Sequence, residues 1–263
     1  MSSNWSLDLV TREVDAGVGR LHLNDPRHRN VLSKQLSDQL ASAVTDVVAR
    51  GAAAIVLTAE PPVFCAGGSL DGLLNRELPL AQTYAGYRAL IEAPVPTIAA
   101  VAGAAVGAGV NLPLACDVVI AAESARFDPR FLDVGIHPGG AHLWRLVQRV
   151  GVQGAAALVL LGDTLTGAEA QAHGLAWRCV PDTELDAVAL ALATRVATRS
   201  ASLVRRTKQT LQATLAATSF EEAFALELDA QEWSVNQPEF TSTIRRIQGE
   251  ITARKTNGGA TSP

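Results

Sequence analysis

The sequence predicts a mixed α/β core over residues 1–200, followed by an all-helical region over residues 201–263. Three observations predict this division. Short apolar stretches alternate with segments whose apolar residues recur at helical spacing, as they do in α/β folds with crossover connections. Beyond about Pro181 only helical periodicity remains. Hydrophobic residues make up 48% of the 263 residues, which is enough apolar material for a sizeable core.

Four segments of the first half are predicted to be strands. The stretch VGRLHLND (18–25) alternates apolar and polar residues and stops at Asn-Asp-Pro, as a half-buried strand does. The runs AAAIVLTA (52–59), VPTIAAVAG (95–103) and DVVIAA (117–122) are apolar throughout and are typical of buried strands. Between the first two strands a helix is expected to begin after Ser33, whose hydroxyl can cap it.

Two later helix starts carry the capping-box pattern. Thr166-Gly-Ala-Glu169 and Ser219-Phe-Glu-Glu222 each place a hydroxyl three residues before a glutamate. In such a box the hydroxyl and the carboxylate bind each other's backbone N–H groups at the first turn of a helix. We therefore expect helices to begin at both positions.

Composition and charge exclude several classes of protein. With 22 basic and 26 acidic residues the formal charge is −4, which gives no reason to expect nucleic acid as a partner. No apolar run reaches the ~18 residues of a membrane span, and the N-terminal segment lacks a secretory signal pattern. We expect a cytoplasmic protein with no membrane partner. Cys65, Cys116 and Cys179 contain no CxxC pair, which predicts buried, reduced thiols and no metal site.

Two segments share a strand–turn–helix design that is rich in small residues, IVLTAEPPVFCAGGSLDGL (55–73) and AVAGAAVGAGVNLPLACD (100–117). The N-terminus of a helix leaves backbone N–H groups unpaired and carries a positive partial charge. Two such groups aimed at one point would form an oxyanion hole. Gly68 and Ala108 are the positions predicted to supply them, and the alternative is that both turns merely cap their helices.

Pro113 fixes where the second of these helices begins. Proline is tolerated in the first turn of a helix, where its missing N–H is not needed. The helix is therefore expected to begin near residues 109–111, which places Asn111 in its first turn, close to the N–H of Ala108. The stretch GGSLDG is not a match to the GxSxG serine-hydrolase pattern, so Ser69 is expected to be a turn or cap residue.

Several segments of the sequence resemble conserved segments of one protein family. PPVFCAGGSLDGL resembles the crotonase signature FCAGADL, and residues 100–140 resemble its second block, a glycine triplet followed by CELAMMCD, a strand and PE-x-x-x-G-x-x-PG. RHRNVLSKQL (27–36) resembles RPxxxNALN, and LTGAEAQAHGLAWRCVP (165–181) resembles LTAEEAxxxGLVxxVVP. The four blocks occur in the family's order over most of residues 7–210. The chain is therefore identified as a member of the enoyl-CoA hydratase/isomerase (crotonase) superfamily.

The resemblance implies a spiral of ββα units and a helical region over residues 201–263 that builds homotrimers, often paired into hexamers. It implies acyl-CoA thioesters as substrates, with coenzyme A as part of the substrate and no separate cofactor. The thioester oxygen would lie between the N–H groups of Gly68 and Ala108. Arg29 is expected near the CoA phosphates, with Arg27 as the alternative. The resemblance lines the CoA path with the stretch Ala66, Gly67, Gly68, Ser69 and Leu70.

The sequence departs from the family at both catalytic positions. Hydratases of this family activate and position water with two glutamates, and the matching residues here are Asn111 and Phe131. An amide does not accept a proton at neutral pH, and a phenyl ring has no acid–base chemistry. Asn111 is expected to orient a water or a substrate carbonyl, or alternatively to satisfy backbone groups. Phe131 is expected to line the substrate site.

Asp133 and His137 are the predicted replacements for the missing acids. An imidazole, with an ordinary pKa near ~6.5, is a suitable general base. Asp133 would share a face with Phe131 if the segment were extended. The alternatives are a turn histidine bonded to the backbone and a carboxylate that caps a turn. Asp128 and His142 flank the same region.

These observations lead to one expected function and two alternatives. The family resemblance favours an enoyl-CoA hydratase, although the loss of a catalytic base typically lowers the rate of the catalysed reaction by about 10²–10⁴-fold. The first alternative is an acyl-CoA isomerase, decarboxylase or thioesterase that uses His137 or Asp133. The second is an acyl-CoA-binding protein that has lost catalysis.

Overall fold

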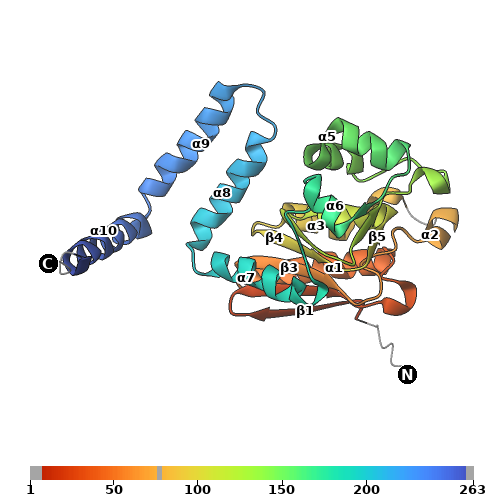
Figure 1. Cartoon of the computed structure of the whole chain (residues 1–263), viewed down its shortest axis with the longest axis horizontal. Coiled ribbons are helices and arrows are strands. Elements are labelled where there is room, and N and C mark those ends of the chain that lie inside the picture. Colours follow the sequence, from red (N-terminus) through yellow and green to blue (C-terminus); the bar gives the residue numbers. More distant parts are fainter. Residues whose placement is uncertain (1–7, 76–78, 259–263) are drawn as a thin grey trace. The chain divides into compact units, whose positions relative to one another are not determined.

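The computed structural model describes residues 8–75 and 79–258, and the chain divides into two compact units, residues 1–198 and 199–263. The first unit is built on two β-sheets (Figure 1). The strands of the larger sheet are β1 (Val10–Asp15), β2 (Val18–Leu23), β3 (Ala54–Ala59), β4 (Thr97–Val101), β6 (Val118–Ala122) and β9 (Arg178–Val180). The strands of the smaller sheet are β5 (Ala104–Val106), β7 (Arg126–Asp128) and β8 (Leu165–Thr166).

The larger sheet has the order β1-β2-β3-β4-β6-β9. Strands β1 and β2 form an antiparallel hairpin, and each later neighbour is parallel to the one before it. The smaller sheet has the order β5-β7-β8. The four strands predicted from the sequence correspond to β2, β3, β4 and β6, so the predicted α/β core is confirmed.

Helices of the first unit connect the strands. The α-helices are α1 (Lys34–Ala49), α2 (Leu70–Asn75), α3 (Ala85–Glu92), α4 (Asn111–Ala115), α5 (His142–Leu160), α6 (Gly167–Ala172) and α7 (Leu185–Ala197). Short 3-10 turns are η1 (Pro26–His28), η2 (Leu80–Tyr84), η3 (Gly107–Val110), η4 (Leu132–Val134) and η5 (Asp182–Glu184). Helix α5 contains a break at Gly151, where φ is 71° and ψ is 175°.

Both faces of the central strands β3, β4 and β6 are largely buried, which explains why these strands are almost entirely apolar. Successive side chains of a strand point to opposite faces. In β3, Ile55 and Leu57 belong to the larger core cluster with residues of α1 and α3, whereas Ala54 and Val56 belong to a second cluster with residues of α7. A strand covered on both faces loses the alternation seen in a half-buried strand.

The predicted helix starts are confirmed. The Ser33 hydroxyl accepts a hydrogen bond from the Leu36 N–H (3.1 Å) at the start of α1. Thr166 and Glu169 form the full capping box of α6. Helix α9 (Phe220–Val235) begins after Ser219, whose hydroxyl accepts from the N–H three residues later.

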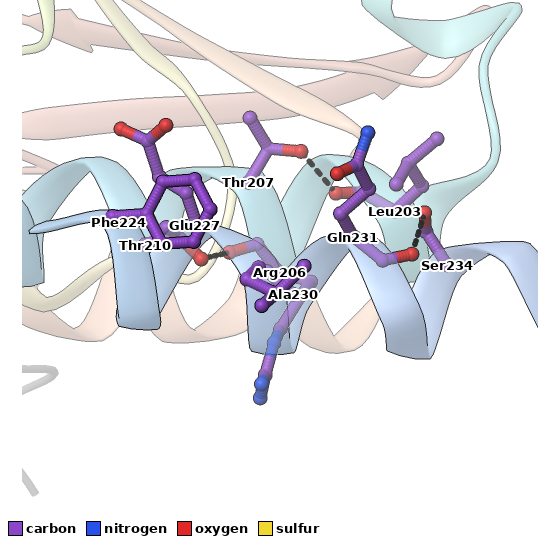
Figure 2. A pocket seen from close by; sticks show the side chains of 10 residues that line it. Leu203, Arg206, Thr207, Thr210, Phe224, Glu227, Ala230, Gln231 and Ser234 are labelled. Carbon is purple, nitrogen blue, oxygen red and sulfur yellow. Dashed lines mark hydrogen bonds between the residues drawn. The ribbon is translucent and has the colours of Figure 1, made fainter.

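The described part of the second unit consists of α8 (Ala201–Thr214), α9 and α10 (Pro238–Gly258), as the helical periodicity of the sequence predicts. Helices α8 and α9 pack together and line an open pocket of about 400 Å³ with both polar and apolar side chains (Figure 2). Beside it the Arg206 guanidinium pairs with Asp229 and lies 5.9 Å from the ring centroid of Trp233. The oligomerisation expected of residues 201–263 stays a prediction.

Two further expectations concern the thiols and the membrane. Cys65 and Cys116 are buried as predicted, and burial raises the pKa of the Cys65 thiol to about 12. The prediction was wrong for Cys179, which is only partly buried because it lies on the edge strand β9. Within residues 8–75 and 79–258, no single helix is long and apolar enough to cross a membrane.

Candidate active site

The two glycine-rich turns lie backbone against backbone. The Cys65 N–H donates to the Ala104 carbonyl (3.1 Å), and the Val106 N–H donates to the Cys65 carbonyl (2.9 Å). A Cβ on Gly67, whose φ is +95°, would stand 2.6 Å from the Val106 carbonyl oxygen, and a Cβ on Gly109 would collide with the Cys65 carbonyl. Only glycine permits so close an approach. The sequence pattern therefore serves to bring these two turns together.

Gly68 and Ala108 lie directly beside this crossing. The Cβ position of Gly67 is 3.5 Å from the Ala108 nitrogen, so the two turns meet next to both predicted donors. The Leu32 N–H occupies the Gly67 carbonyl (2.7 Å). Neither the Gly68 N–H nor the Ala108 N–H has an acceptor in the described part of the chain. Two unpaired donors from adjacent turns are what an oxyanion hole requires.

The residues predicted to line the CoA path differ in their contacts and exposure. The Ala66 N–H donates to the Arg29 carbonyl (3.0 Å), which holds the exposed Arg29 against this turn. The Ser69 hydroxyl accepts from the Gly72 N–H (3.2 Å), so Ser69 is a turn residue as expected from the residues alone. Leu70 is largely exposed at the start of α2. The contribution of each to CoA binding stays a prediction.

Asn111 is the first residue of α4 and is buried at 2% exposure. The helix begins where Pro113 predicts. The amide is held from both ends, because its Nδ2 donates to the Gly139 carbonyl (3.2 Å) and its Oδ1 lies 2.6 Å from Nδ1 of His142. Through its own N–H, which donates to the Ala108 carbonyl, Asn111 follows Ala108 within one turn. The amide is thus fixed next to the predicted oxyanion donor.

His142 contacts both residues that stand where the family resemblance implies glutamates, Asn111 and Phe131. It begins α5, is buried at 1% exposure, and packs its ring against Phe131 with the ring centroids 4.8 Å apart. Its Nε2 is buried and meets no donor from the described residues. Burial lowers the pKa of His142 to about 4. The positive partial charge of the N-terminus of α5 acts in the same direction.

Sequence reasoning named His142 only as a flanking residue. The available signal was a histidine at a helix start after the Pro138-Gly139-Gly140 turn, and nothing in its spacing pointed to a partner 31 residues away. Tyr84 was not predicted at all. A Cβ on Gly140 would stand 2.7 Å from the Tyr84 ring, so Tyr84 lies over the same turn, and burial raises the pKa of its hydroxyl.

The structure separates Asp133 and His137 from this cluster. The premise for Asp133 was wrong, because residues 132–134 form a 3-10 turn and not an extended segment, so Asp133 does not share a face with the buried Phe131 by alternation. Asp133 is exposed. His137 is also exposed, and its Nδ1 lies 2.7 Å from the Pro138 carbonyl oxygen, as in the alternative of a backbone-bonded turn residue. Their catalytic roles stay predictions.

Four side chains make up this cluster. They are the amide of Asn111, the imidazole of His142, the phenyl ring of Phe131 and the phenol of Tyr84. None of the four carries a charge at pH 7, since burial lowers the pKa of His142 and raises that of Tyr84. The flanking Asp128 is buried but pairs with Arg130. The site therefore combines two unpaired N–H donors, which suit a developing negative charge, with a neighbouring group of uncharged side chains.

Comparisons with known proteins agree with this geometry. The family model described as "Enoyl-CoA hydratase/isomerase" matches residues 13–247. The chain is 39% identical over 254 residues to the Mycobacterium tuberculosis protein named "Probable enoyl-CoA hydratase EchA14", covering 92% of this chain and 98% of the relative. It is 36% identical over 202 residues to the Escherichia coli 2,3-dehydroadipyl-CoA hydratase, covering 73% and 77% of the two chains.

Solved structures of other proteins show a similar fold. The enoyl-CoA hydratase of Mycobacterium smegmatis has a TM-score of 0.85 at 25% identity, covering 92% of this chain and 96% of that one. Human enoyl-CoA hydratase domain-containing protein 3 has a TM-score of 0.86 at 24% identity, covering 92% and 98%, a likeness of fold alone. The predicted crotonase-like fold is confirmed. The match over most of the chain shows that this protein belongs to the enoyl-CoA hydratase/isomerase family.

Proposed function

We propose that this protein is an enoyl-CoA hydratase that adds water across the double bond of a 2-enoyl-CoA thioester. The observation that carries the proposal is the pair of unpaired N–H groups, Gly68 and Ala108, beside the buried amide of Asn111. Hydrogen bonds to the thioester oxygen withdraw electrons from C3 of the conjugated substrate. They also stabilise the enolate that forms when water adds there, as in other oxyanion holes.

The amide of Asn111, beside the two donors, has the chemistry to hold a water. An amide offers both a donor and an acceptor, and the contacts of Asn111 leave one Nδ2 proton and one Oδ1 lone pair beyond those already used. Asn111 orients the water and does not itself accept its proton. The hydratase names of the relatives support the same reaction. Coenzyme A enters as part of the substrate, with the backbone around Ala66 and Arg29 as its proposed path.

Product analysis tests this function. The protein is mixed with 2-enoyl-CoA esters of increasing chain length in ¹⁸O-labelled water, and the expected product carries one added, labelled water. An isomerase would leave the mass unchanged and move the double bond. A thioesterase would release free CoA, and a decarboxylase would release carbon dioxide from a malonyl-type ester. Binding of a saturated acyl-CoA without turnover of any ester would contradict the proposal and identify a binding protein.

A matched pair of proline variants tests the oxyanion hole. Ala108→Pro removes one donor at the first turn of η3, where the backbone needs no intrahelical N–H. We expect kcat to fall by about 10²–10³-fold, the usual effect of losing one oxyanion donor. The control is Ala201→Pro at the first position of α8, which is outside the site. Equal kcat values in the two variants would remove Ala108 from the mechanism.

The second unit is proposed to be the oligomerisation region, in keeping with the family resemblance. Its exposed apolar side chains include Phe220, Phe224 and Phe240. Light scattering of the whole chain after size exclusion is expected to give the mass of a trimer or a hexamer. A monomeric mass would contradict this proposal without affecting the proposed reaction.

A further inference from the structure

The hydrogen bonds around Asn111 determine which nitrogen of His142 carries the proton. The Gly139 carbonyl can only accept, so it must receive a hydrogen from Nδ2 of Asn111, and this orients Oδ1 of the amide toward His142. An amide oxygen also only accepts. The 2.6 Å contact therefore needs a proton on Nδ1 of His142. A neutral imidazole has one N–H, so Nε2 carries a free lone pair.

This lone pair lies in an unusual place for an unpaired acceptor. Buried polar atoms normally have partners, and one without a partner costs about 1–3 kcal/mol. Nε2 of His142 is buried and receives no hydrogen bond from residues 8–75 and 79–258. Its ring contacts Phe131, at the position of the second family glutamate, and Asn111, at the position of the first. The unpaired atom thus belongs to the part of the site in which the family's carboxylates are missing.

We infer that Nε2 of His142 is the proton acceptor of this enzyme and takes the role that Asn111 and Phe131 cannot perform. The inference rests on the proposed hydration. As the water oxygen bonds to C3, Nε2 takes one of its protons, and the π electrons of the C2–C3 bond move to the thioester oxygen. The enolate oxygen is held by the Gly68 and Ala108 N–H groups. The imidazolium then returns the proton to C2, so the sum of the steps is the addition of one water.

The surroundings of His142 keep this base neutral between turnovers. Tyr84 on η2 and Tyr87 on α3 have pKa values raised by burial, so neither is an anion that would hold an imidazolium. On its own helix, Arg145 donates to the Leu114 carbonyl (3.1 Å). Asp133 and His137 on the preceding segment are exposed. The opposite charge that stabilises the transient imidazolium is then the enolate itself.

The test separates the base from its hydrogen bond to Asn111. His142→Asn places an amide N–H near the position of Nδ1, which preserves the bond to Asn111 and removes the Nε2 lone pair. We expect kcat for hydration to fall by about 10²–10⁴-fold, with KM changed only a few-fold. The control is His173→Asn, the same replacement at an exposed histidine that ends α6. Partial rescue of a His142→Gly variant by added imidazole is the second expected result.

A measurement without turnover distinguishes this inference from the proposed function. In ¹⁵N-histidine NMR of the free protein, His142 is expected to show a protonated Nδ1 and an unprotonated Nε2 from pH 8 to pH 5. A protonated Nε2 would overturn the inference whatever the enzyme does. So would a folded His142→Asn variant that keeps more than a tenth of the wild-type kcat. If the wild type hydrates no enoyl-CoA, the proposed function fails, and the tautomer still decides whether Nε2 is a free acceptor.

Discussion

One half of the candidate active site consists of backbone groups, and the other half consists of side chains. At the crossing of the two turns the groups proposed to bind the thioester oxygen are the backbone N–H donors of Gly68 and Ala108, and the surrounding glycines are needed for the close approach. The other half consists of side chains, Asn111, Phe131 and His142. A backbone donor survives most substitutions, whereas a side-chain acid is lost by a single one. The backbone half of the candidate site therefore depends less on the identity of single side chains than the other half does.

The largest expected effect on stability comes from a substitution in the side-chain half of the candidate active site. Asn111→Leu removes the partners of the buried His142 Nδ1–H and of the partly buried Gly139 carbonyl. A buried group left without a partner costs about 1–3 kcal/mol and the partly buried carbonyl costs less, so the free energy of unfolding is expected to fall by about 2–4 kcal/mol. Urea unfolding compares the variant with the wild type. An Asn111→Leu variant as stable as the wild type would show that the amide network contributes nothing to stability.

The second prediction concerns the pH dependence of stability. Burial lowers the pKa of His142 from 6.5 to about 4, so the unfolded chain binds a proton that the folded chain excludes. The stability that this group contributes is present above about pH 6.5 and is lost as the pH falls toward 4. The full loss is about 3 kcal/mol. We expect this slope in urea unfolding of the wild type between pH 7 and pH 4, and a shallower slope in His142→Gln. Identical slopes would mean that His142 is accessible to protons in the folded state.

The third prediction sharpens the description of the backbone half. Gly67→Ala places a Cβ 2.6 Å from the Val106 carbonyl oxygen at a φ of +95°, and it is expected to lower the unfolding free energy by about 1–3 kcal/mol. Its neighbour offers the control, since a Cβ on Gly68 meets only the Leu73 side chain at 4.0 Å. Gly68→Ala should leave the unfolding free energy within about 0.5 kcal/mol of the wild type. Equal destabilisation by both variants would contradict the close crossing.

The smallest expected effect concerns the exposed residues of the segment that follows Phe131. Asp133→Ala and His137→Ala should each change the unfolding free energy by less than about 0.5 kcal/mol, because both side chains are exposed. Thermal melts measure this directly. A fall of 10²-fold in the kcat of His137→Ala would assign the base to His137 and would contradict the assignment to His142.

The sequence predicted the fold, and the meeting of the two glycine-rich turns, because both depend on local patterns. Apolar runs predicted β3, β4 and β6, and small residues at 65–68 and 105–109 indicated turns that would meet. Helix α4 begins where Pro113 requires, which placed Asn111 correctly. These features follow from neighbouring residues and from the family pattern.

The side-chain half was not predictable in the same way. The pairing of Asn111 with His142 joins α4 to the start of α5, and no periodicity relates the two positions. Proximity in sequence favoured Asp133 and His137, but a 3-10 turn at 132–134 and a bond to the Pro138 carbonyl give both residues other environments. A buried histidine is recognised only when its partners are known.

The pH dependence of kcat/KM for hydration of an enoyl-CoA tests the central claim most directly, because it reports the pKa of the essential base in the free enzyme. Samples held at each pH are assayed again at pH 7, which separates titration from unfolding. We predict a constant kcat/KM from pH 8 to about pH 5 and a fall centred near the His142 pKa of about 4. A fall centred near about pH 6.5, the ordinary pKa of a water-exposed imidazole, would contradict it.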